Sequence, residues 1–162
     1  MTEAMFRKMQ RVRQQLTLEE CMEILKKEPR GVLSVLGDNG YPYGMPMNFW
    51  YDASDGNIYF HGGKTGHKVD ALKNCDKVSF CVYDQGYRRE GEWALNIKSV
   101  IVFGRISVIA DDKLTLEISR KLSFKYTPDS DYIEEEIKKA GAATLCLRLI
   151  PEHMTGKLVN EA

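Results

Sequence analysis

Three apolar, strand-type runs follow one another in the first half of the chain, each separated from the next by a turn sequence. The runs cover residues 31–37, 43–52 and 57–62. Asp38-Asn39-Gly40 separates the first two runs, and Asp55-Gly56 precedes the third. Short runs at this spacing predict antiparallel strands joined by hairpins, and we expect these three to form a meander. Pro46 cannot donate a ladder hydrogen bond, so we expect it at an edge, an end or a bulge.

The rest of the sequence predicts more strands and several helices. Further strands are expected at 77–84, at 99–110 and within 143–159, the last as a strand pair or one bent strand. Helices are expected at 18–28, 67–74, 112–126 and 131–140. Thr17 and Glu20 form a capping box for the first helix, Asp131 is the expected cap of the last, and Gly141 its end. Gly104 predicts a bulge in the long strand.

These elements predict a mainly β fold, a small antiparallel barrel with peripheral helices. The 162 residues, 43% of them hydrophobic, suffice for one core, so we expect a single domain over 1–162, with residues 1–16 as a basic lead-in. Lysine plus arginine and aspartate plus glutamate both number 23, which gives no reason to expect nucleic acid or a membrane as partner.

The four cysteines show no C-x-x-C pair, which argues against a zinc site or a disulfide framework. We expect plain buried or half-buried thiols, no metal, and a cytoplasmic protein. The sequence contains no apolar run long enough to span a membrane and no apolar secretory segment near its start.

The glycine–lysine loop, which we define as residues 62–68, is the most informative stretch for function. It matches neither G-x-x-x-x-G-K-[ST] nor G-x-G-x-x-G. It nevertheless places Gly66 and His67 at the start of a helix, where free backbone N–H groups and the helix dipole attract anions. Lys68 lies in the first turn, an unfavourable place for a cation unless an anion lies opposite. The loop therefore predicts either a phosphate site or an ordinary solvated turn.

Other chemistry is less well indicated. His61 and His67 lack a third ligand for a metal, and His61 is equally consistent with a hydrogen-bonded wall residue. No G-x-S-x-G elbow is present. Consecutive aromatic residues at 49–51 alternate faces in a strand and do not form a base-stacking platform.

The succession of these segments resembles the pyridoxamine 5′-phosphate oxidase-like flavoproteins, and within them the nitroimidazole-resistance branch. The segments are GVLSVLGDNGYPYGMPMNFWYD, IYFHGGKTGHKVDALKNCDKVSFCV, KSVIVFGRI and the terminal MTGK. The resemblance extends from the lead-in to Lys157. It implies an FMN-binding split β-barrel that forms a homodimer with flavin at the subunit interface.

The resemblance also implies roles for particular residues. Lys68 matches the lysine that contacts the FMN phosphate, with Gly62, Lys64, Gly66 and His67 beside it. Ser99 and Val100 match a strand pair that approaches the phosphate and ribityl chain. Met47 and Asn48 match the strand along the isoalloxazine edge, His61 lies near the ring as the candidate catalytic residue, and Trp93 is a candidate contribution from the partner subunit.

The implied function is an FMN-dependent oxidoreductase that reduces a small aromatic or nitro compound. Arg88, Arg89 and Arg105 do not reproduce the arginine pattern of the vitamin-synthesising oxidases, which argues against pyridoxamine phosphate as substrate. Two alternatives stay open. One is a flavin-binding or flavin-storing protein without turnover, and the other is a haem-binding barrel with His61 or His67 as axial ligand.

Overall fold

The computed structural model describes residues 6–161, so the first five residues of the predicted lead-in lie outside the described residues. The strands are β1 (Arg30–Leu36), β2 (Pro42–Asn48), β3 (Trp50–Asp52), β4 (Asn57–Gly63), β5 (Lys77–Tyr83), β6 (Asn96–Val108) and β7 (Thr144–Asn160). The helices are α1 (Leu18–Lys27), α2 (His67–Asn74), α3 (Asp112–Phe124) and α4 (Ser130–Ala140), with short 3₁₀ turns η2 (Val12–Gln14), η3 (Asp38–Gly40) and η4 (Gly141–Ala143).

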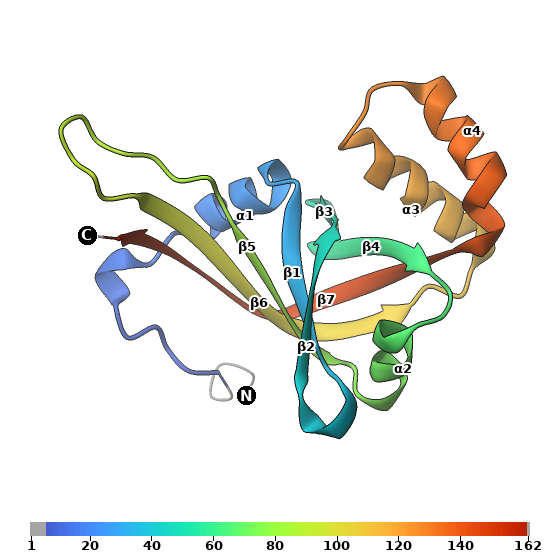
Figure 1. Cartoon of the computed structure of the whole chain (residues 1–162), viewed down its shortest axis with the longest axis horizontal. Helices are drawn as coiled ribbons and strands as arrows, with labels where there is room; N and C mark the ends of the chain where they lie inside the picture. The colour runs from blue at the N-terminus through green and yellow to red at the C-terminus, as the bar shows by residue number, and fades with distance from the viewer. Residues whose placement is uncertain (1–5, 162) are drawn as a thin grey trace.

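Over this range the strands form one seven-stranded antiparallel sheet in the order β2-β1-β5-β6-β7-β4-β3. The sheet is strongly curled, with α2 beyond the end of β4 and with α3 and α4 grouped together (Figure 1). The predicted fold class, a mainly antiparallel split barrel with peripheral helices, is confirmed. No helix among the described residues is long and apolar enough to cross a membrane.

The main core lies on the inner face of the curled sheet. The apolar face of α1, which carries Cys21, Ile24 and Leu25, packs against residues of β1, β5, β6 and β7 there. Thr17 caps α1 as predicted, because its Oγ1 accepts the Glu20 N–H. A second cluster lies on the outer face of β4 and β7, beneath α3.

The predicted meander is confirmed in its consecutive pairings, because 42–48 pairs with 30–36 and 50–52 pairs with 57–59, but its middle strand is split in two. β4 pairs with β3 and β7 and forms no ladder with β2, so the β1–β2 and β3–β4 hairpins occupy opposite ends of the strand order. The predicted strand 43–52 is interrupted at Phe49, where the chain passes from β2 to β3. The physical reason is that side chains from the end of α3 bind the backbone of Phe49.

Three expectations about single strands concern an edge, a bulge and the C-terminal segment. β2 is an edge strand, as Pro46 suggested. The register shift at Gly104 confirms the bulge, although the extra residue is Glu152 on the opposite strand, and a Cβ at Gly104 would collide with the Ile150 carbonyl. The C-terminal segment is one long strand.

Two boundaries differ from the prediction. β6 begins at Asn96, three residues earlier than expected. The cap of α4 is Asp129, whose carboxylate accepts the Tyr132 N–H; Asp131 lies inside the first turn instead. Asp129 and Asp131 flank Ser130, so the sequence offers both as the cap of this helix. The path of the preceding turn decides between them.

All four cysteines are free thiols, as expected. Cys21 and Cys146 are buried and Cys75 and Cys81 are partly exposed. Burial raises the pKa of Cys21, Cys81 and Cys146, so these thiols are protonated and poorly nucleophilic at neutral pH.

Candidate functional site

The glycine–lysine loop contains the last two residues of β4 and the first two of α2, and its central residues are exposed at the surface. Gly66 is the N-cap of α2 with φ of 132°, a left-handed conformation that strongly favours glycine. No side chain caps this helix. The first-turn N–H groups are therefore left for solvent or for an anion.

Lys68 folds back from the first turn of α2 over the bare Cα of Gly62. A Cβ built on Gly62 would lie 2.9 Å from the Lys68 Nζ. Glycine at position 62 thus leaves the space that the ammonium group occupies. Within residues 6–161 the Lys68 side chain has no hydrogen bond or ion pair, and burial lowers its pKa. A partly desolvated cation without a partner is energetically unfavourable and favours an anionic ligand.

His61 lies on β4, directly opposite Cys146 of β7. Cross-strand partners share a face of a sheet, so His61 lies on the outer face with Cys146. Burial, and secondarily the charge of Lys68, lower the pKa of His61. The imidazole is therefore neutral at pH 7 and sits close enough to the Lys68 ammonium to feel its field.

His67 is held by its own chain. Its ring stacks on Tyr43 at a centroid distance of 4.2 Å, and its Nε2 accepts the backbone N–H of Asp38 at 3.3 Å. These contacts attach α2 to the β1–β2 hairpin. What His67 offers at the helix start is mainly its backbone N–H group.

Lys64 faces a different space. It lines a cavity of about 590 Å³ between the loop, α3 and α4, together with Asp112 and Thr115. The structure therefore brings His61, Gly62, Gly66 and Lys68 together as one group, which we call the α2 corner, whereas Lys64 lines the neighbouring cavity.

The remaining predicted residues lie elsewhere in the chain. Met47 is buried in the core, whereas Asn48 at the end of β2 is partly exposed and its carboxamide has no hydrogen bond within the described residues. Trp93 is 74% exposed in the loop between β5 and β6. Ser99 is partly exposed on β6, and the side chain of Val100 is fully buried in the core.

Ser99, Val100 and Trp93 lie far from the α2 corner. Gly62 pairs with Leu145 near the start of β7, and Val100 pairs with Gly156 near its end. These two positions on β7 are eleven residue steps apart, which corresponds to roughly 35 Å measured along the strand. In Figure 1 α2 and the β5–β6 loop accordingly lie at opposite sides of the molecule. A small ligand in the α2 corner does not reach both groups of one chain.

Sequence reasoning missed one pair of residues near Asn48. Lys125 and Tyr126, at the end of α3, hydrogen-bond to Phe49, the residue that follows Asn48. A Lys-Tyr pair after a helix carries no recognisable pattern, so only the structure reveals the contact. Within the described range no group of three or more potential metal-ligating side chains is present.

Comparison with known proteins gives a family and a set of similar folds. The profile of the family described as pyridoxamine 5′-phosphate oxidase matches residues 17–158. No curated protein matches the sequence.

Three similar solved structures illustrate the fold. A candidate 5-nitroimidazole antibiotic resistance protein from Bacteroides thetaiotaomicron has a TM-score of 0.76 at 20% identity, covering 90% of this chain and 87% of that one. An FAD- and haem-binding protein from Mycobacterium smegmatis has a TM-score of 0.71 at 23% identity, with 92% and 74% covered. An FAD-binding protein from Mesorhizobium loti has a TM-score of 0.63 at 23% identity, with 90% and 96% covered.

Proposed function

The chain belongs to the pyridoxamine 5′-phosphate oxidase family, and on that premise we propose that it binds FMN and serves as an FMN-dependent oxidoreductase for a small aromatic or nitro compound. The observation that carries this proposal is the partly buried ammonium of Lys68, which has no polar partner among residues 6–161 and lies beside Gly62 and the uncapped start of α2. A terminal phosphate provides the negative charge and the acceptor oxygens that these groups lack.

The residues present fit a flavin phosphate. Gly62 has no side chain to exclude it, Gly66 permits the sharp entry into α2, and Lys68 supplies a charge. Asn48, whose carboxamide has no hydrogen bond to any residue that the structure describes, supplies a polar group for the edge of a ring. When bound, flavin supplies the redox chemistry, while the protein supplies position and polarity. His61, neutral at pH 7, is the side chain that we propose to hold and move a proton there.

We further propose a homodimer in which the partner completes the site. The outer face of the sheet presents apolar side chains that are 36–59% exposed: Val32, Leu36, Tyr83, Ile101 and Phe103. An exposed apolar patch of this kind is typical of an interaction surface. A second copy packed there would bring its own Trp93 and Ser99 toward an α2 corner that they do not reach within one chain.

The names of two of the similar structures specify FAD, and the name of the third specifies no flavin. We favour FMN because the α2 corner offers one concentrated anion site, suited to a terminal phosphate. Nitro-compound reduction is favoured by the similarity to the Bacteroides protein.

The first test is a titration of the purified protein with FMN and, separately, with FAD, followed by absorption spectroscopy and calorimetry. We expect one FMN bound per chain, with weaker binding of FAD. Failure to bind FMN, whether as purified or after saturation, would refute the proposal. A Soret band on adding haem, without flavin binding, would favour the haem-binding alternative.

The second test separates an oxidoreductase from a flavin carrier. Bound FMN is offered NADH or NADPH and then a nitroaromatic acceptor, and the flavin absorbance is followed. We expect the bound flavin to be reduced and then reoxidised, and we expect His61→Gln to slow both steps while largely retaining FMN affinity. A flavin that no donor reduces would support a storage protein.

The third test concerns the dimer. Sedimentation measures the oligomeric state of the wild type and of Ile101→Lys, and we expect the substitution to disrupt the dimer.

A further inference from the structure

The end of α3 contacts the backbone of Phe49 through two consecutive side chains. The Lys125 Nζ donates to the carbonyl oxygens of Glu28 at 2.7 Å and Phe49 at 3.0 Å. The Tyr126 hydroxyl accepts the Phe49 N–H at 2.9 Å and lies 2.7 Å from the Pro29 carbonyl and 3.0 Å from that of Phe49, one of which takes its proton. We call Lys125 and Tyr126 the Phe49 clamp.

The clamp replaces strand pairing at the point where the chain leaves β2 for β3. Both backbone polar groups of Phe49 are bound by side chains from residues more than 70 positions away. The Phe49 ring is fully buried, packs edge-on against Phe80 at 4.9 Å, and has the Lys125 ammonium 3.5 Å from its centroid. Backbone and ring are thus both fixed, which leaves residue 49 one defined position.

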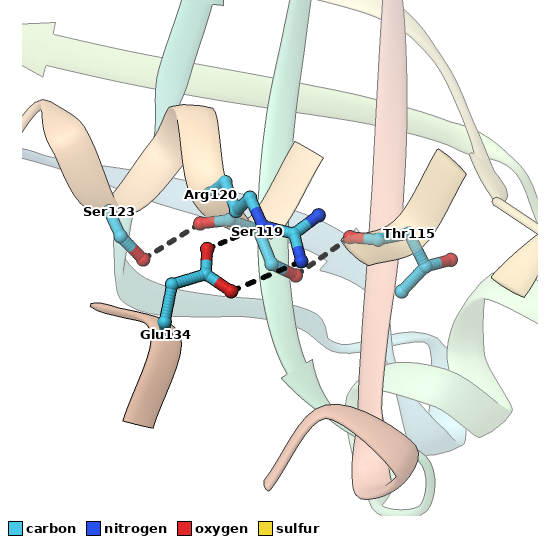
Figure 2. Close-up of polar contacts among 5 residues, drawn as sticks. All are labelled: Thr115, Ser119, Arg120, Ser123 and Glu134. Carbon is cyan, nitrogen blue, oxygen red and sulfur yellow. Dashed lines mark hydrogen bonds and ion pairs between the residues drawn. The ribbon is translucent and has the colours of Figure 1, made fainter. Parts of the chain in front are cut away.

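α3, which carries the clamp at its C-terminal end, is held in place on two sides. Ser119 on its buried side donates to the Thr115 carbonyl and contacts Cys146 of β7, so the helix is seated on the sheet. On its other side Arg120 pairs with Glu134 of α4 at 2.6 and 3.3 Å. Figure 2 shows Glu134 reaching Arg120 beside the row of serine hydroxyl bonds along α3. Lys125 and Tyr126 are therefore held at the end of a helix anchored on two sides.

Asn48 is the residue immediately before Phe49, and its carboxamide is free in the described part of the chain. A fixed backbone at residue 49 limits where the preceding residue can lie, and small displacements of ligand-binding groups weaken binding strongly. We propose that Lys125 and Tyr126 are positioning residues for Asn48, which they hold where it meets the polar edge of the isoalloxazine ring. This inference rests on the proposed FMN binding.

The test uses Tyr126→Phe and Lys125→Met, with Ile118→Val as the control. Ile118 is buried on α3, so the control loosens the same helix without touching Phe49. Hydrogen exchange at the Phe49 amide is measured by NMR in the flavin-free protein. We expect it to be about tenfold faster or more in Tyr126→Phe, because this variant lacks the hydroxyl that accepts the Phe49 N–H. In Ile118→Val the exchange rate should stay near that of the wild type.

With FMN, we expect both clamp variants to raise the Kd about three- to tenfold and to shift the absorption bands of the bound flavin, because Asn48 is misplaced. Lys125→Arg, which retains charge and donors, should stay within about twofold of wild type. Clamp variants whose bound-flavin spectrum and Kd equal those of Ile118→Val would overturn the inference and leave FMN binding intact. A wild-type protein that binds no flavin would overturn both. If Tyr126→Phe does not fold, Lys125→Met and Lys125→Arg decide the matter.

Discussion

Lys68 and Lys125 are both partly buried lysines whose pKa is lowered by burial, yet their surroundings differ completely. Lys125 donates to two carbonyl oxygens and lies over the Phe49 ring, all within its own chain. Lys68 lies over Gly62 and has no polar partner in the described residues. Burial alone therefore does not distinguish a scaffold residue from a binding residue.

The difference lies in where the compensation for desolvation comes from. A buried charge is tolerated when hydrogen bonds and nearby electron-rich groups replace water. For Lys125 the fold provides this replacement. For Lys68 the described residues provide none, which is why the α2 corner is the candidate site. The Phe49 clamp, in contrast, is part of the scaffold.

The largest expected effect is on ligand binding at Lys68. Lys68→Ala should weaken FMN binding by about 1.5–3 kcal/mol, the size of a charge-assisted hydrogen bond to phosphate, with little loss of stability. Isothermal titration calorimetry measures the change. Lys73→Ala, in the last turn of the same helix, is the matched control. Equal affinities for wild type and Lys68→Ala would remove the distinction between the two lysines.

At Lys125 we expect a substitution to change the stability of the fold. Lys125→Met should lower the free energy of unfolding by about 1–2 kcal/mol, because the Glu28 and Phe49 carbonyls lose their donor. Urea denaturation of the flavin-free proteins measures this. Lys68→Ala serves as the comparison and should be nearly neutral. If Lys68→Ala proves more destabilising than Lys125→Met, Lys68 contributes to the stability of the fold.

A smaller effect on binding is expected from Gly62→Ala. The new Cβ would displace the Lys68 Nζ, which can move because it ends a flexible side chain. We expect the Kd for FMN to rise about three- to tenfold while the urea midpoint changes little. Gly63→Ala is a suitable control, since a Cβ there meets only ordinary contacts. A comparable loss of affinity in both variants would mean that the loop conformation matters more than the position of the ammonium.

The smallest effect concerns pH. Burial lowers the pKa of Lys125 from 10.5 to about 8, with Glu28 opposing the shift. Between these values the unfolded chain binds more protons than the folded one, so stability attributable to this group increases as pH rises above 8 and is lost as pH falls back through 8. Because the group is partly exposed, we expect no more than about 1 kcal/mol between pH 8 and 9.5.

This increase is measured as the difference in unfolding free energy between wild type and Lys125→Met at each pH. Using the difference removes the titration of the tyrosines and of the other lysines. A difference that is flat from pH 7 to 9.5 would show that Lys125 is better solvated than its contacts indicate.

Local sequence was sufficient for much of the fold. Four features were predictable because each depends on the backbone preferences of one or two neighbouring residues: the Thr17 cap, the turn at Asp38–Gly40, the start of α2 at Gly66 and the irregularity at Gly104. The continuous strand 43–52 was wrong, and the predicted meander is split between the two ends of the strand order. The reason is that the pairing of β4 with β7 and the break at Phe49 depend on residues about 80 positions away.

The candidate site divides in the same way. The glycine–lysine loop was recognisable as anion-binding chemistry from its residues alone. The direction of Lys64, the attachment of His67 to Tyr43 and the distance of Ser99 from the α2 corner were not, because side-chain direction and strand order are set by packing between distant segments.

The sequence by itself determined which segments become strands and helices and where a phosphate-type site begins, since hydrophobic period, glycine conformation and helix capping act over a few residues. Only the tertiary structure decided that Lys68 has no polar partner among residues 6–161 while Lys125 donates to two carbonyl oxygens. That outcome depends on which carbonyls, rings and glycines converge in space, and convergence is a property of long-range packing.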